Sequence, residues 1–145
     1  MLVLAACAHP STDPRDHTED ESLAYITETI FVPYCGTAEC HSSFRRELGY
    51  VFDSVAAAQV SIQSFGLVAC TGSNGQSYDP CDGAVPGNDL PGAPLTESTI
   101  LVGILNATSF PRMPFDQPLA DKDIAFIGQW IVDGADGYVS SVTVN

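Results

Sequence analysis

The chain has 145 residues, 45% of them apolar, which suits one globular domain with a hydrophobic core and excludes a wholly disordered chain. Eighteen acidic residues against five basic ones give a net charge of −13 at pH 7, which excludes the clustered positive charge that nucleic-acid binding requires. No apolar run approaches the roughly 18 residues of a membrane-spanning helix.

The N-terminus divides into two pieces, residues 1–7 and 8–21. Residues 1–7 are apolar and end in Leu4-Ala5-Ala6-Cys7, which resembles a bacterial lipobox, where small residues precede a cysteine that receives lipid. This resemblance implies a partial lipoprotein signal, with Cys7 as the lipidated residue of an exported, membrane-anchored protein. Residues 8–21 are polar, acidic and proline-containing, and they predict a flexible tether.

The segment before Cys7 departs from a complete signal peptide. Only six residues precede this cysteine and none is basic, whereas a secretory signal has a basic start and about 7–15 apolar residues. Two explanations remain open. Either the true start lies upstream of Met1, or the match arises by chance and Cys7 is an ordinary thiol on a frayed terminus.

Two helices are predicted in the first half of the domain, which spans residues 22–136. Apolar residues recur at helical spacing from Glu21 to Tyr34, and Pro33 falls where this helix should end. An alanine-rich run over residues 55–60 predicts the second helix. The expected N-cap residues are Ser22 or Asp20 for the first helix and Asp53 or Ser54 for the second.

Residues 66–95 form a Gly/Pro-rich insertion, which predicts a long loop or a series of turns. A loop of this length is unusual in a compact domain and favours a covalent staple. Cys70 and Cys81 lie inside the insertion, and a disulfide between them would lower the entropy of the unfolded chain.

Two further helices are predicted in the second half. Thr96 is the expected N-cap of a helix that runs to about residue 106. Apolar residues at helical spacing predict the last helix over Asp121 to Asp133, and Gly134 follows it as a C-cap glycine would. The tail, residues 137–145, is expected to be a short strand or disordered.

The motif Cys35-Gly36-Thr37-Ala38-Glu39-Cys40-His41 carries the chemistry. Two thiols followed at once by an imidazole are what covalent haem attachment requires, with the cysteines on the vinyl groups and the histidine under the iron. The usual motif has two residues between the cysteines, and here there are four. Cys40 is still followed directly by His41, and this adjacency fixes one edge of the haem relative to the iron. The small residues after Cys35 can bulge outward so that Cys35 still reaches a vinyl group.

Two other interpretations of these cysteines stay open. An exported domain without haem would pair Cys35 with Cys40 and Cys70 with Cys81, and would act as a binding or structural module. A zinc site would draw on the same four cysteines and His41, but ten residues lie between Cys70 and Cys81, more than the usual separation of about 2–4.

A second feature supports the haem interpretation. Beyond the initiator the chain has one methionine, Met113, held between Pro111 and Pro114. The second proline disfavours the α conformation at Met113, so a rigid extended segment is expected there rather than a helix face. Thioether sulfur is a common axial ligand in cytochromes c. Arg112 could pair with a haem propionate, or it could be a solvated surface arginine.

These pieces together resemble the small c-type cytochrome domains of exported bacterial proteins. The order is a helix running into the cysteine motif, a late Met-Pro loop, and a closing helix from Leu119 through Trp130 to Ala135. The resemblance covers about residues 22–136 and implies an all-α, cytochrome c-like fold in which the first and last helices cross. The Gly/Pro-rich insertion and Ala120 in place of a good cap depart from the pattern.

The sequence therefore predicts a monohaem c-type cytochrome that carries single electrons and is not an enzyme. Haem c is expected to be held by Cys35 and Cys40, with His41 and Met113 on the iron. The protein is expected at the periplasmic face or cell surface, anchored to the membrane through Cys7, with a redox partner whose docking surface is basic. The same acidic charge equally serves solubility. The expected aromatic shell around the haem is Tyr34, Phe44, Phe110, Phe115 and Trp130.

Overall fold

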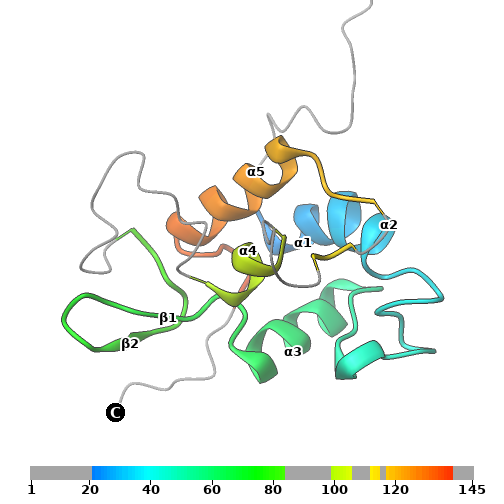
Figure 1. Ribbon diagram of the computed structural model, residues 1–145, viewed down its shortest axis with the longest axis horizontal. Helices are drawn as coiled ribbons and strands as arrows, with labels where there is room; N and C mark the ends of the chain where they lie inside the picture. The colour runs from blue at the N-terminus through cyan, green and yellow to red at the C-terminus, as the bar shows by residue number, and fades with distance from the viewer. Residues whose placement is uncertain (1–20, 84–98, 106–111, 115–116, 139–145) are drawn as a thin grey trace, which may run out of the picture.

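The computed structural model describes residues 21–83, 99–105, 112–114 and 117–138. Helices dominate these ranges, and one small antiparallel sheet accompanies them (Figure 1). No helix in the described ranges is long and apolar enough to cross a membrane. The following sequence predictions concern residues outside these ranges: Cys7 and almost all of the tether, Thr96, Phe110, Phe115 and the tail beyond Tyr138.

The first predicted helix is present as one continuous helical segment of three parts. These are α1 (Leu23–Ile26), a π-helical stretch η1 (Thr27–Phe31) and α2 (Val32–Tyr34). Ser22 is the N-cap, and its hydroxyl accepts a hydrogen bond from the Tyr25 amide at 3.2 Å. Pro33 lacks an N–H donor, so one bond of the helical ladder is missing there. At the end of the segment, the carbonyl of Phe31 accepts from the amides of both Cys35 and Gly36, each at 2.7 Å.

The second helix, α3 (Val55–Phe65), is longer than the sequence predicts. Ser54, one of the two expected caps, accepts from the Ala57 amide at 3.3 Å. The helix continues five residues beyond Val60 and ends at Gly66, which has a left-handed φ of 58°. A short 3₁₀ turn, η2 (Glu47–Gly49), lies in the loop between the first segment and α3.

The insertion contains a small hairpin that the sequence analysis does not predict. Strand β1 (Cys70–Thr71) pairs antiparallel with β2 (Ser77–Tyr78), and Cys70 lies opposite Tyr78. The disulfide predicted between Cys70 and Cys81 is present. Because each strand has two residues, no alternating apolar pattern could reveal it.

The last two helices are α4 (Ile100–Leu105) and α5 (Asp121–Val132). Helix α5 agrees with its prediction to within one residue. Ala120 makes no side-chain cap, but Asp121 and Asp123 in the first turn place negative charge at the positive end of the helix dipole. Gly134, with a φ of +97°, follows the C-terminus.

The core joins the two ends of the described chain. Tyr25 on α1 meets Phe126 on α5 edge-on, with ring centroids 5.8 Å apart. The Leu23 amide donates to the Asp136 carbonyl at 2.9 Å, and the fully buried Trp130 donates its indole N–H to the same carbonyl at 3.0 Å. The first and last helices are therefore in direct contact, and α3 lies across the other side of the molecule (Figure 1).

Candidate functional site

An apolar cavity of about 230 Å³ opens between η1, the loop that precedes α3, helix α4 and the segment around Met113. Its volume is several times the roughly 30 Å³ that one water occupies and lies just below the roughly 300–1,000 Å³ that is usual for ligand pockets, so it is larger than a packing void. Its hydrocarbon lining consists of Phe31, Leu48, Phe52, Leu67, Leu101, Ile104 and Leu105. The remaining residues that line the cavity are Tyr50, Cys35, His41 and Met113.

His41 is the nitrogen donor of the cavity. It is 8% exposed, and its Nδ1 lies 3.0 Å from the backbone carbonyl oxygen of Glu47. Because a carbonyl can only accept, Nδ1 carries the hydrogen, and Nε2 keeps a free lone pair. Tyr50 and Phe52 contact the ring edge-on at 5.6 and 5.8 Å. The imidazole is therefore fixed in both orientation and tautomer, as metal-binding histidines are.

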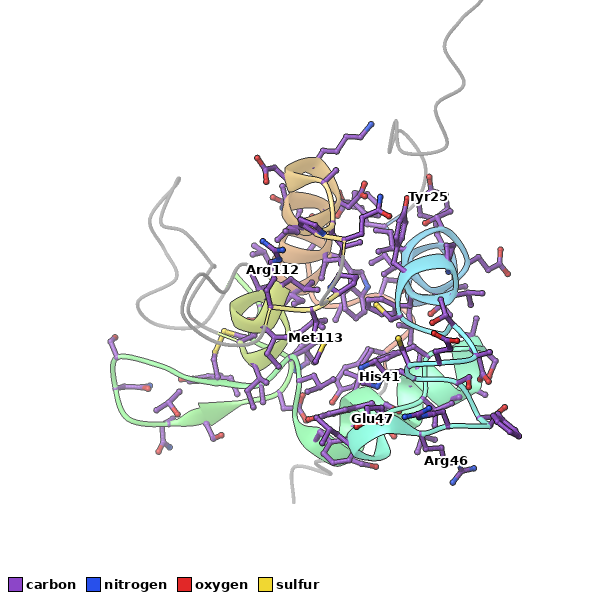
Figure 2. The ribbon with its side chains drawn as sticks, turned by 45° about the vertical axis from the view of Figure 1, so that its right-hand side comes forward. Tyr25, His41, Arg46, Glu47, Arg112 and Met113 are labelled. Carbon is purple, nitrogen blue, oxygen red and sulfur yellow. A yellow bond between two sulfur atoms is a disulfide. The ribbon has the colours of Figure 1, made fainter. Side chains whose placement is uncertain are left out.

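Met113 is the sulfur donor of the cavity. Its amide donates to the carbonyl of Ile104 at 3.3 Å, which ties the extended Met-Pro segment to α4. The peptide bond between Met113 and Pro114 is cis. Figure 2 shows Met113 and His41 in the middle of the molecule, the first beside α4 and the second in the loop after α2. Two residues 72 positions apart thus line one apolar space.

The two motif cysteines lie in different surroundings. Cys35 is buried and lines the cavity, and burial, with a smaller contribution from Cys40, raises the pKa of its thiol to about 12. Cys40 is exposed and faces an outer recess beside Tyr34 and Pro114. Both thiols are free, so the structure lacks the Cys35–Cys40 disulfide that the interpretation without haem requires.

The second pair of ligands that the zinc interpretation requires is not available either. Cys70 and Cys81 are bonded to each other and have no thiolate to offer. Within the described residues, no group of three or more His, Cys, Asp or Glu side chains could hold a metal ion.

Arg112, next to Met113 in sequence, is half-buried. Its Nε is buried and has no hydrogen-bond partner within the described part of the chain. A buried guanidinium nitrogen without an acceptor costs free energy, so its position favours an anionic ligand group nearby.

The expected aromatic shell is largely wrong. Phe44 is 90% exposed, Tyr34 faces the outer recess, and Trp130 belongs to the core rather than to the cavity lining. The rings that do line the cavity are Phe31, Tyr50 and Phe52. The alternation of Tyr50 and Phe52, which places both on one side of an extended segment, is the signal that could have found two of them.

Comparison with known proteins adds no assignment: no family model, no curated protein and no solved structure matches this chain.

Proposed function

We propose that this chain is a monohaem c-type cytochrome that transfers single electrons between protein partners outside the cytoplasm. One observation carries the proposal. A fixed imidazole with a free Nε2 and a thioether sulfur line the same apolar cavity, and a motif cysteine lies on its wall. This is the donor set of a cytochrome c, assembled from segments far apart in sequence.

The residues present fit a haem. Its macrocycle is flat and largely apolar, and the cavity lining is almost entirely hydrocarbon. Its propionates are anionic, and the buried Nε of Arg112, which has no hydrogen-bond partner among the described residues, offers them a charge-assisted hydrogen bond. His41 and Met113 would hold the iron. Cys35, on the cavity wall, would supply one thioether bond, and Cys40 would supply the other by turning from the outer recess towards the haem.

Each of these residues has a distinct task. The Glu47 carbonyl holds the His41 ring so that Nε2 remains available as a ligand. The apolar lining keeps water away from the site, which disfavours the more highly charged oxidised state. A bound haem supplies one-electron chemistry at its iron. If His41 and Met113 both held the iron, no position would be left for a substrate, and the protein would act as a carrier rather than an enzyme.

The proposed location follows from the lipobox-like Leu4-Ala5-Ala6-Cys7 and the tether that follows it. Lipid on Cys7 would hold the domain at a membrane surface, in the periplasm or at the cell exterior. The net charge of −13 would steer the domain towards partners with basic surfaces.

Covalent haem attachment is the direct test of this function. We expect the chain, expressed with a haem-maturation system, to be coloured and to keep its haem through acid-acetone extraction. Replacing Cys35 and Cys40 by serine should make the haem extractable or absent. The matched control is the replacement of Cys70 and Cys81 by serine, which should leave haem attachment intact. A colourless protein, or one whose haem is extracted as readily as that of the Cys35/Cys40 variant, would overturn the proposal.

A further inference from the structure

A line of aromatic rings leads from the candidate iron ligand to the protein surface. The ring of Tyr50 lies 5.6 Å from that of His41, and the ring of Phe65 lies 4.2 Å from that of Tyr50. Phe65 is 40% exposed. Its ring rests on Gly49, where an added Cβ would come within 3.2 Å of the Phe65 ring. The absence of a side chain at Gly49, which has a φ of +88°, thus lets the last ring lie close to the loop.

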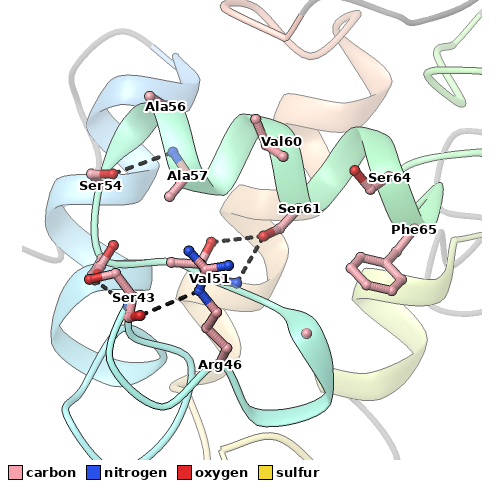
Figure 3. Close-up of a pocket in the computed structure, with 12 residues that line it drawn as sticks. Ser43, Arg46, Val51, Ser54, Ala56, Ala57, Val60, Ser61, Ser64 and Phe65 are labelled. Atoms are coloured by element: carbon pink, nitrogen blue, oxygen red, sulfur yellow. Dashed lines mark hydrogen bonds between the residues drawn. The ribbon is translucent and has the colours of Figure 1, made fainter.

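Phe65 lies at one end of an open surface groove of about 700 Å³ (Figure 3). The loop that contains Ser43 and Arg46 forms one wall, and the exposed side of α3 forms the other. Small side chains of α3 line the groove on its helix side, and Val60 is 60% exposed there. The groove is concave, and apolar and polar side chains line it in similar measure, which suits a protruding segment of another protein.

The groove has no net charge on a strongly acidic chain. Its two charged lining residues, Arg46 and Asp53, have opposite signs. Hydrogen bonds from Ser43, and to a smaller extent the positive charge of Arg46, hold the pKa of Asp53 below its usual value, so Asp53 is charged at neutral pH. Next to Arg46 in the chain, Arg45 pairs with Glu47 at 3.7 Å. The negative charge of −13 therefore lies elsewhere on the chain.

We propose that this groove, lined by Ser43, Arg46, Val60 and Phe65, docks an electron-transfer protein that inserts an uncharged segment with both apolar and hydroxyl groups, and that the electron passes through Phe65 and Tyr50. This inference rests on the proposed function. One electron leaves the chain and reduces the partner by one electron, and the reverse step oxidises the partner. No bond or proton moves, and the rings keep their oxidation state. A second copy of this chain is a poor occupant, since two chains of −13 repel each other.

Because the groove is neutral, the acidic charge and the groove would have different effects on a partner. Charge outside the groove would steer a basic partner from a distance, where it acts on the association rate. Contact at the groove itself would depend on apolar burial and on hydrogen bonds between uncharged groups, and it should change little with salt.

The test uses the haem-loaded protein and an electrode that imitates the partner. Gold coated with a mixed methyl- and hydroxyl-terminated monolayer is the uncharged probe, and an amine-terminated monolayer is the basic one. Adsorbed mass and electron-transfer rate are recorded together. We expect adsorption and exchange on the uncharged monolayer with little dependence on salt. Val60→Asp should weaken adsorption about tenfold, whereas Ala125→Asp, at an exposed site on α5, should not.

The ring pathway is tested by Phe65→Leu, which should keep adsorption and slow electron exchange several-fold. Phe44→Leu is its control, since Phe44 is an exposed ring outside the line from His41.

Exchange that requires the amine-terminated surface and is unaffected by Val60→Asp would overturn the docking proposal. So would a dimer in solution that Val60→Asp dissociates, because the groove would then join two copies. Equal rates for Phe65→Leu and Phe44→Leu would overturn the pathway. A chain without covalent haem would instead refute the proposed function itself.

Discussion

At the scale of single residues, the site depends on what surrounds each donor atom. His41 is an ordinary imidazole whose direction is set by one backbone carbonyl and two neighbouring rings. Cys35 and Cys40 have the same chemistry, but one is buried against the cavity and the other faces solvent. These differences give predictions that can be checked residue by residue.

The two motif thiols should differ in reactivity in the haem-free chain. Only the thiolate is nucleophilic, and a pKa of about 12 leaves Cys35 protonated at about pH 8. We expect iodoacetamide to modify Cys40 rapidly and Cys35 slowly, as measured by peptide mass spectrometry. Denaturant should make both react at similar rates. Equal modification in the folded chain would mean that Cys35 is not buried as described.

Arg112 should influence the reduction potential of the haem-loaded protein. Removal of a positive charge beside the haem stabilises the oxidised state, so Arg112→Met is expected to lower the potential. Arg45→Met is the matched control, because Arg45 is exposed and pairs with Glu47. A redox titration measures both variants. Equal shifts would remove Arg112 from the haem environment.

At the scale of elements, helix ends set the positions of the cavity walls. Helix α3 begins at the Ser54 cap, and its far end leads directly to Leu67, whose carbonyl accepts from the Leu101 amide of α4 at 2.9 Å. The disulfide then holds the hairpin close behind this connection. The placement of the cavity walls therefore depends on local signals as much as on long-range packing.

Loss of the Ser54 cap should weaken the fold measurably. Ser54→Ala removes the acceptor for the Ala57 amide and should lower the free energy of unfolding by about 1 kcal/mol. Ser64→Ala, at an exposed position of the same helix, should change it by less than about 0.5 kcal/mol. Urea unfolding monitored by circular dichroism measures both. Identical values would show that α3 is not capped through the Ser54 side chain.

Several elements could be predicted from sequence because their signals are local. The caps at Ser22 and Ser54, the stop after α5 at Gly134 and the pairing of Cys70 with Cys81 all depend on residues close together in the chain. The π-helical stretch escaped prediction because one proline inside a helical pattern does not reveal how the freed carbonyls are satisfied. The aromatic shell failed for a related reason, since composition alone cannot say which way a ring such as Phe44 points.

At the scale of the whole molecule, the fold brings together residues that the sequence could name but not place. Cys35, His41 and Met113 were expected to act together, and the structure places all three on one cavity. The apolar residues of α4 that complete the cavity wall could not be recognised as site residues from their sequence alone. They become part of the site because the Met113 segment is hydrogen-bonded to Ile104.

The central claim is that His41 and Met113 ligate one haem iron, and the absorption spectrum of the oxidised, haem-loaded protein tests it most directly. Methionine–iron ligation gives a weak band near the red end of the spectrum. We expect this band in the original chain and its loss in Met113→Ala, with the Soret band retained because the thioether bonds and His41 still hold the haem. A red band that persists unchanged in Met113→Ala would contradict the account.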